Sequence, residues 1–140
     1  MRDNFQIPYG IADFKRLRRE GYYYIDKTGY IRLLEQAGSF LFFVRPRRFG
    51  KSLMASMLRC YYDIAEKDNF DALFGGLEIA KSPTANANRY QVLYMDFSKI
   101  GGTANLSLQE RFENYVGKQL DDFMRLYGSA YESDVREDFA

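Results

Sequence analysis

The pattern of apolar residues is most informative in residues 39–62, where it changes from continuous to periodic. Residues 40–44, FLFFV, form an unbroken apolar run, which predicts a buried strand. After an arginine-rich turn, apolar side chains recur at helical spacing, at Leu53, Met57, Leu58 and Tyr61. We therefore expect a strand, a turn and a helix in this order.

Before this stretch, the pattern predicts two short helices with an extended segment between them. Residues 11–20 carry apolar side chains on one face and four basic residues elsewhere, which we interpret as a solvated face rather than a DNA-binding patch. Residues 22–25 contain β-prone aromatic residues and predict the extended segment. The second helix is expected to be capped by Asp26 or Thr28 and to end near Gly38.

After this stretch, the pattern predicts helical turns, a loop, a second strand and a long helix. Apolar residues between 70 and 79 indicate short helical turns with a break at the glycine pair 75–76, and residues 81–88 have the composition of an exposed, mobile loop. Residues 92–95 form a second apolar run that leads to Asp96, and we expect a second strand over residues 92–96. Ser107 to Glu110 match a capping box that opens a helix, which we expect to end or kink near Gly128, before an acidic helix or tail.

These elements predict an α/β fold, a partial P-loop NTPase fold with a small parallel sheet flanked by helices. Its two core strands would be residues 40–44 and 92–96, joined by a right-handed crossover through the helix that follows the turn. A length of 140 residues fits one domain.

Composition narrows the possible chemistry. The chain has no histidine, which excludes a histidine general base and a Ser-His-Asp triad, and its single cysteine, Cys60, is expected to be a packed thiol. No apolar stretch is long enough for a membrane helix, so we expect a cytoplasmic protein without membrane contact. Residues 1–60 hold 12 Lys and Arg against 5 Asp and Glu, a net +7, which suits an anionic partner or an acidic second half of the same fold.

The turn itself has the composition of a phosphate-binding loop. A helix that begins at a glycine turn offers unpaired N–H groups and its positive dipole end to phosphate oxygens. Lys51 would contact the β- and γ-phosphates, and the hydroxyl of Ser52 would bind Mg²⁺. The expected nucleotide-binding residues are Arg45, Pro46, Arg47, Arg48, Phe49, Gly50, Lys51 and Ser52.

The loop departs from the usual G-x-x-x-x-G-K-[ST] pattern, because Arg45 occupies the first glycine position. A glycine there normally supplies permissive backbone geometry, so this loop must open differently, with Pro46 fixing its entry. A Gly-Lys-Ser triplet also arises by chance, and the arginines would then form a solvated loop.

The segments RPRRFGKSL and IPYGIADFKRLRREGYYYIDKTGYI together resemble the AAA-ATPase-like family of uncharacterised bacterial proteins, over residues 7–98. The family's loop reads R-P-R-R-F-G-K-[ST], so the resemblance makes Arg45 expected. It implies a P-loop fold, of which residues 1–140 would be the N-terminal part. Many relatives carry a C-terminal restriction-endonuclease-like domain, and we expect that domain and a later Asp-Glu strand to lie beyond Ala140. The family's Asp-Lys-Thr element matches Asp26 to Thr28, either as a structural turn or as a wall of the nucleotide pocket.

Asp96 is the second candidate Mg²⁺ ligand. Four apolar residues that end in an aspartate match a Walker B strand, whose carboxylate reaches the metal through water. The next residue is Phe97 rather than glutamate, so we favour an ordinary strand end and assign no catalytic residue.

The sequence therefore predicts the binding of ATP with Mg²⁺ as part of a predicted ATPase, and it leaves hydrolysis open. The alternative is a nucleic-acid-binding or interaction module that uses the basic loop without hydrolysis, and a third possibility is a degenerate P-loop with a structural role. Expected partners are a nucleotide, nucleic acid in a full-length protein, and other copies or a missing C-terminal segment.

Overall fold

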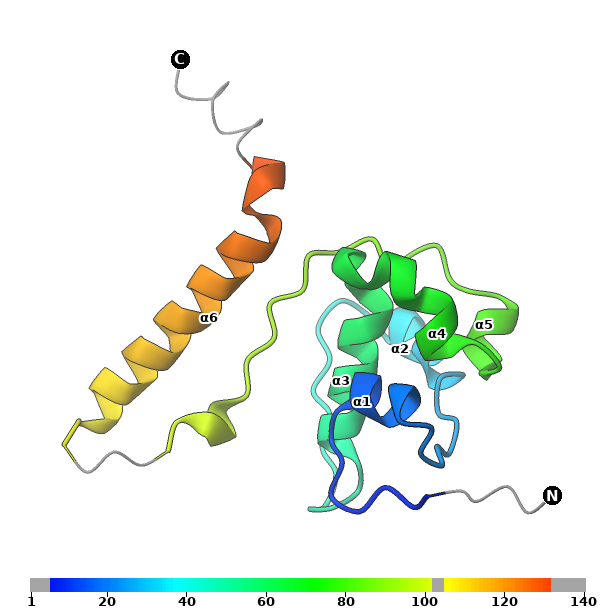
Figure 1. The fold of residues 1–140 in the computed structure, drawn as a ribbon, viewed down its shortest axis with the longest axis horizontal. Coiled ribbons are helices and arrows are strands. Elements are labelled where there is room, and N and C mark those ends of the chain that lie inside the picture. The colour runs from blue at the N-terminus through cyan, green and yellow to red at the C-terminus, as the bar shows by residue number, and fades with distance from the viewer. Residues whose placement is uncertain (1–5, 102–104, 132–140) are drawn as a thin grey trace. The chain divides into compact units, whose positions relative to one another are not determined.

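The computed structural model describes residues 6–101 and 105–131. The chain divides into two compact units, Met1–Tyr90 and Gln91–Ala140. The elements of the first unit are α1 (Phe14–Arg19), α2 (Tyr30–Ala37), α3 (Lys51–Tyr62), the 3-10 helix η1 (Ile64–Asn69), α4 (Phe70–Phe74) and α5 (Glu78–Lys81) (Figure 1). Those of the second unit are the 3-10 helix η2 (Phe97–Lys99) and α6 (Leu108–Tyr131).

The predicted α/β fold with a parallel sheet is wrong, because the described residues form helices and a single isolated parallel bridge, between Asp63 and Tyr90. Residues 40–44 are irregular and exposed, and residues 92–96 are irregular as well. The physical reason is that a strand needs a neighbouring strand for its backbone N–H and C=O groups. An apolar run indicates that a segment tends to be buried, but it does not determine which strand the segment would pair with.

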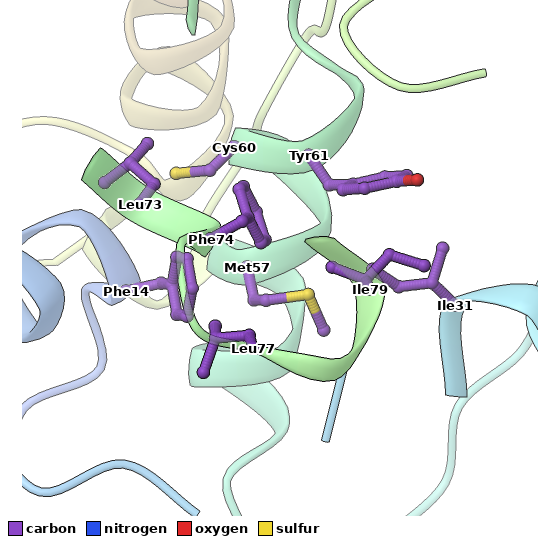
Figure 2. Packing of buried hydrophobic residues seen from close by; sticks show 9 residues of the cluster. All are labelled: Phe14, Ile31, Met57, Cys60, Tyr61, Leu73, Phe74, Leu77 and Ile79. Carbon is purple, nitrogen blue, oxygen red and sulfur yellow. The ribbon is translucent and has the colours of Figure 1, made fainter. Parts of the chain in front are cut away.

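The core of the first unit is built around α3, in agreement with the predicted helical spacing. Met57 and Tyr61 are fully buried, and α1, α2, α4 and α5 contribute the side chains that surround them. Figure 2 shows these buried residues, which are Phe14, Ile31, Met57, Cys60, Tyr61, Leu73, Phe74, Leu77 and Ile79. Burial of each large side chain stabilises the fold by about 1.5–3 kcal/mol, so this cluster is the main source of stability in the unit.

Helix α1 is shorter than predicted but lies in the predicted place. The side chain of Asp13 caps it by accepting a hydrogen bond from the backbone N–H of Arg16 at 3.1 Å. Arg18 of this helix is not a solvated residue, since its guanidinium donates to the carbonyl oxygens of Leu73 at 2.7 Å and Gly75 at 2.8 Å. Arg18 thereby satisfies carbonyl groups at the end of α4 and ties α1 to it.

The segment 81–88 differs from the exposed, mobile loop that its composition predicts. Asn88 is buried, with its backbone N–H donating to the Tyr61 carbonyl at 2.8 Å and its side-chain amide donating to the Asp63 carbonyl at 2.8 Å. Thr84 bonds the Tyr61 hydroxyl through its backbone N–H at 2.8 Å. The segment is therefore anchored to the end of α3 by polar residues that a composition argument assigns to solvent.

Helix α6 begins at the predicted capping box. The Ser107 side chain accepts from the Glu110 N–H at 3.2 Å, and the Glu110 carboxylate accepts from the Ser107 N–H at 2.7 Å. The helix was expected to end or kink near Gly128. It does not end there, because it continues to Tyr131. The acidic helix or tail expected after it lies outside the described residues.

Candidate phosphate-binding loop and adjoining pocket

Two residues with left-handed backbone conformation shape the candidate loop immediately before α3. Arg48 has φ 67° and Gly50 has φ 74°. A Cβ added to Gly50 would meet no atom within 4 Å, so the glycine is needed for its backbone conformation and not for space. Gly50 is also the N-cap residue of α3, which starts at Lys51 as expected.

The N-terminal end of α3 is open to solvent and has no acidic neighbour in its own first turn. Gly50 supplies no side-chain cap, and Lys51 and Ser52 are exposed at the start of the helix. The first N–H groups of a helix lack intrahelical partners and carry the positive end of its dipole. Helix α3 is continuous over twelve residues, so its N-terminal end carries the positive end of a helix dipole. This end therefore has the electrostatics of an anion site.

The loop closes on itself through Lys51. The Lys51 Nζ donates a hydrogen bond of 2.7 Å to the carbonyl oxygen of Arg45, which joins the last part of the loop to its first residue. The Arg45 guanidinium lies over the ring of Phe43, with Cζ 5.7 Å from the ring centroid. Arg45 is not among the residues with positive φ, which explains why this loop opens without a glycine at that position.

All eight predicted loop residues are exposed, and they lie together as consecutive residues of one turn and the first turn of α3. Pro46, Arg47 and Phe49 are the remaining exposed residues of this turn. The structure thus forms a basic, solvent-facing loop at the predicted place. Residues 40–44, which were expected to form a strand before it, form no strand.

A pocket of about 480 Å³ adjoins the loop, within the first unit. Arg45, Phe49 and Gly50 line it from the loop, and Leu53 and Met54 line it from the first turns of α3. Further lining residues come from α2 and from the segment before it, including Tyr23, Tyr24, Lys27, Tyr30 and Leu33. The resemblance gives a wall of the nucleotide pocket as one of two alternative roles for Asp26 to Thr28, and Lys27 of that turn lines this pocket. The tyrosines that line it were not predicted.

A family model for predicted AAA-ATPases matches residues 8–140, nearly the whole chain. The chain belongs to the AAA-ATPase-like family. This confirms the resemblance drawn from the loop and from the segment before it. An uncharacterised protein in the vnfD 5′ region of Azotobacter chroococcum mcd 1 is 46% identical over 54 residues, which cover 38% of this chain and 10% of that relative. The matched segment is thus a tenth of the relative's length, and no solved structure matches the chain.

The Asp-Lys-Thr turn of this AAA-ATPase-like chain serves α5. The Asp26 carboxylate accepts from the Glu78 N–H at 2.7 Å, and the buried Thr28 hydroxyl accepts from the Ile79 N–H at 3.2 Å. Asp26 also accepts from the Thr28 hydroxyl at 2.7 Å. The two side chains therefore cap a helix about fifty residues away in sequence, while Lys27 between them lines the pocket. The cap of α2 itself is Gly29 and not Asp26 or Thr28.

Burial and hydrogen bonding shift the pKa of Asp26 in opposite directions. Burial raises the pKa of its carboxyl group, but the bonds from Thr28 and Glu78 outweigh burial and hold the pKa below its usual value. The carboxylate form is therefore the form that this turn of the AAA-ATPase-like chain stabilises.

Asp96, the second predicted Mg²⁺ ligand, caps η2 in the second unit. Its carboxylate accepts from the hydroxyl of Ser98 at 2.6 Å and from the Ser98 N–H at 3.1 Å. The hydroxyl bond lowers the pKa of Asp96. The strand expected to end here is absent from the described residues, so Asp96 is a loop residue and not a strand end. A metal site shared with Ser52 of the first unit stays a prediction.

Among the residues that the structure describes in this AAA-ATPase-like chain, no group of three or more His, Cys, Asp or Glu side chains is arranged to hold a metal ion. No helix among the same residues has the length and apolar character to span a membrane.

Proposed function

We propose that residues 45–52 form a Walker A-like loop that binds the polyphosphate of ATP together with Mg²⁺, as the nucleotide-binding part of a predicted ATPase. The observation that carries this proposal is the open start of α3 behind a left-handed Gly50, with the ammonium group of Lys51 held across the loop at the Arg45 carbonyl. Membership of the AAA-ATPase-like family supports it.

The start of α3, Lys51 and Ser52 each have a specific role in this proposal. The N–H groups at the start of α3 donate to phosphate oxygens, and the dipole of the helix favours the negative charge. Lys51 exchanges its bond to the Arg45 carbonyl for bonds to phosphate, which provides a charge-assisted interaction. Ser52 would supply its hydroxyl oxygen as a ligand for Mg²⁺, a cation that prefers oxygen ligands. The proposal concerns binding, and it assigns no residue to hydrolysis.

The test is a titration of the chain with a fluorescent ATP analogue, with and without Mg²⁺. Lys51→Met keeps most of the apolar stem and removes the charge, and Lys67→Met makes the same change at an exposed residue of η1 outside the loop. We expect saturable binding by the wild type and Lys67→Met, and a loss of at least about tenfold in Lys51→Met, since charged hydrogen bonds contribute about 1.5–3 kcal/mol. Equal binding by the two variants would reject the proposal.

Ser52→Ala tests the metal separately. The proposal expects this variant to bind the analogue without Mg²⁺ as the wild type does, and to lose the additional affinity that Mg²⁺ gives the wild type. An unchanged response to Mg²⁺ would remove Ser52 from the site.

The exposed arginines of the loop favour a second candidate, a nucleic-acid-binding module. Arg45, Arg47 and Arg48 are all exposed next to the start of α3, and a phosphate backbone would meet the same charges. A titration with DNA at two salt concentrations distinguishes the candidates. Tight, salt-sensitive DNA binding that ATP does not displace would support the nucleic-acid module in place of the nucleotide site.

A further inference from the structure

We infer that the pocket beside the loop holds the base and ribose of the nucleotide, with a tyrosine of α2 as a stacking surface. The inference rests on the proposed function, because it assigns the nucleoside part of the ligand whose phosphates the loop would bind. Three observations carry it: the continuity of the pocket with the loop, the aromatic lining, and the charges of that lining.

Continuity comes first. Arg45, Phe49 and Gly50 belong both to the predicted phosphate loop and to the wall of the pocket. Leu53 and Met54, which also line the pocket, follow on the first turns of α3. A ligand with its phosphates at the start of α3 would therefore have its next chemical groups beside residues that line this pocket.

The lining suits a flat, aromatic group. Tyr23, Tyr30 and Phe49 contribute rings from three separate segments, and the volume of about 480 Å³ lies within the range of small-molecule sites, about 300–1,000 Å³. Tyr30 and Phe49 are 56% and 58% exposed, so their rings offer apolar surface that a ligand could cover. Stacking on such rings is how proteins hold nucleobases without a requirement for one base.

The charges of the residues that line the pocket also favour a nucleotide. The charged residues that line the pocket are Lys27 and Arg45, both cationic, and the lining contains no carboxylate. A cationic ligand would meet only repulsion, whereas an anionic nucleotide with an electron-rich base meets two donors. Lys27 lies in sequence between Asp26 and Thr28, the two residues that cap α5, so its backbone position is fixed by that turn.

The experiment compares ATP with inorganic tripolyphosphate, each with Mg²⁺, by calorimetric titration. Tyr30→Ala removes a pocket ring outside the phosphate loop, and Tyr9→Ala is its control, because Tyr9 is 98% exposed and does not line the pocket. Leu33→Ala, at a 58% exposed pocket residue of α2, is a second variant in case the first one perturbs folding.

We expect the wild type to bind ATP more tightly than tripolyphosphate. Tyr30→Ala should weaken ATP binding by about fivefold to a hundredfold, the range of base–aromatic stacking, and leave tripolyphosphate binding unchanged. Leu33→Ala should weaken ATP binding alone, by a smaller factor, and Tyr9→Ala should change neither.

Two results would overturn the inference while leaving the proposed function in place. One is equal affinity of the wild type for ATP and tripolyphosphate, which would show that the nucleoside part adds nothing. The other is an equal loss of both ligands in Tyr30→Ala. If the wild type binds neither ligand, the proposed function itself fails, and the inference fails with it.

Discussion

The turn at Asp26 to Thr28 gives the sharpest test of how this fold is held together. Thr28 is fully buried, donates its hydroxyl hydrogen to Asp26 and accepts from the Ile79 N–H of α5. Thr28→Val keeps the shape of the side chain and removes both bonds. Thr28→Ser keeps the hydroxyl group and removes one methyl group, so the two variants separate hydrogen bonding from packing.

The expected magnitudes differ between the variants. In Thr28→Val, the buried Ile79 N–H loses its acceptor, which costs about 1–3 kcal/mol, and the bond to the Asp26 carboxylate is lost as well. Because Asp26 is exposed, solvent compensates for part of that second loss, and we expect a total of about 2–4 kcal/mol. Thr28→Ser should cost about 1 kcal/mol, the contribution of one buried methyl group and a small cavity.

The assay is urea denaturation followed by circular dichroism, at neutral and acidic pH. The folded state lowers the pKa of Asp26, so the stability that this carboxylate contributes is present above its ordinary value of 3.8 and is lost as the pH falls through the lower folded pKa. The difference between the wild type and Thr28→Val should therefore shrink in strong acid. A valine variant that is as stable as the serine variant at pH 7 would refute the reasoning.

Three more predictions concern the core, the free thiol and the second unit. Phe74→Ala should destabilise the first unit by about 3–5 kcal/mol, because a fully buried ring that contacts Phe14 and Tyr61 is removed; a loss below about 1 kcal/mol in urea denaturation would contradict the assigned core. Burial raises the pKa of Cys60 to about 11, so at pH 8 iodoacetamide should modify the folded chain far more slowly than the urea-unfolded chain, and equal rates would refute its burial. Glu110→Ala should speed amide hydrogen exchange in the first turn of α6, while Glu113→Ala, one turn further along, should not; the hydrogen bonds from Ser107 lower the pKa of Glu110, so the cap should weaken only as the pH falls below 4.5. Unchanged exchange in Glu110→Ala would show that the capping box does not hold this helix end.

The sequence alone predicted the features that depend on neighbouring residues. The capping box at Ser107 and Glu110 forms because its partners are three residues apart, and α3 begins after Gly50 because a glycine can adopt the left-handed conformation there. The spacing of Met57 and Tyr61 placed both on the buried face of α3 for the same reason, since helical geometry fixes which side chains share a face. The family, too, was evident from residues of the loop and the segment before it.

The tertiary structure decided the features that depend on distant partners. Residues 40–44 are apolar enough for a strand, but they pair with no strand in the described chain, and a backbone needs that pairing to become one. Asp26 and Thr28 have the chemistry of helix caps, yet the helix they cap is α5 and not the adjacent α2. The pocket arises only where the loop, α2 and α3 meet. A linear pattern records what each residue prefers, whereas the partner that satisfies the preference is chosen by packing.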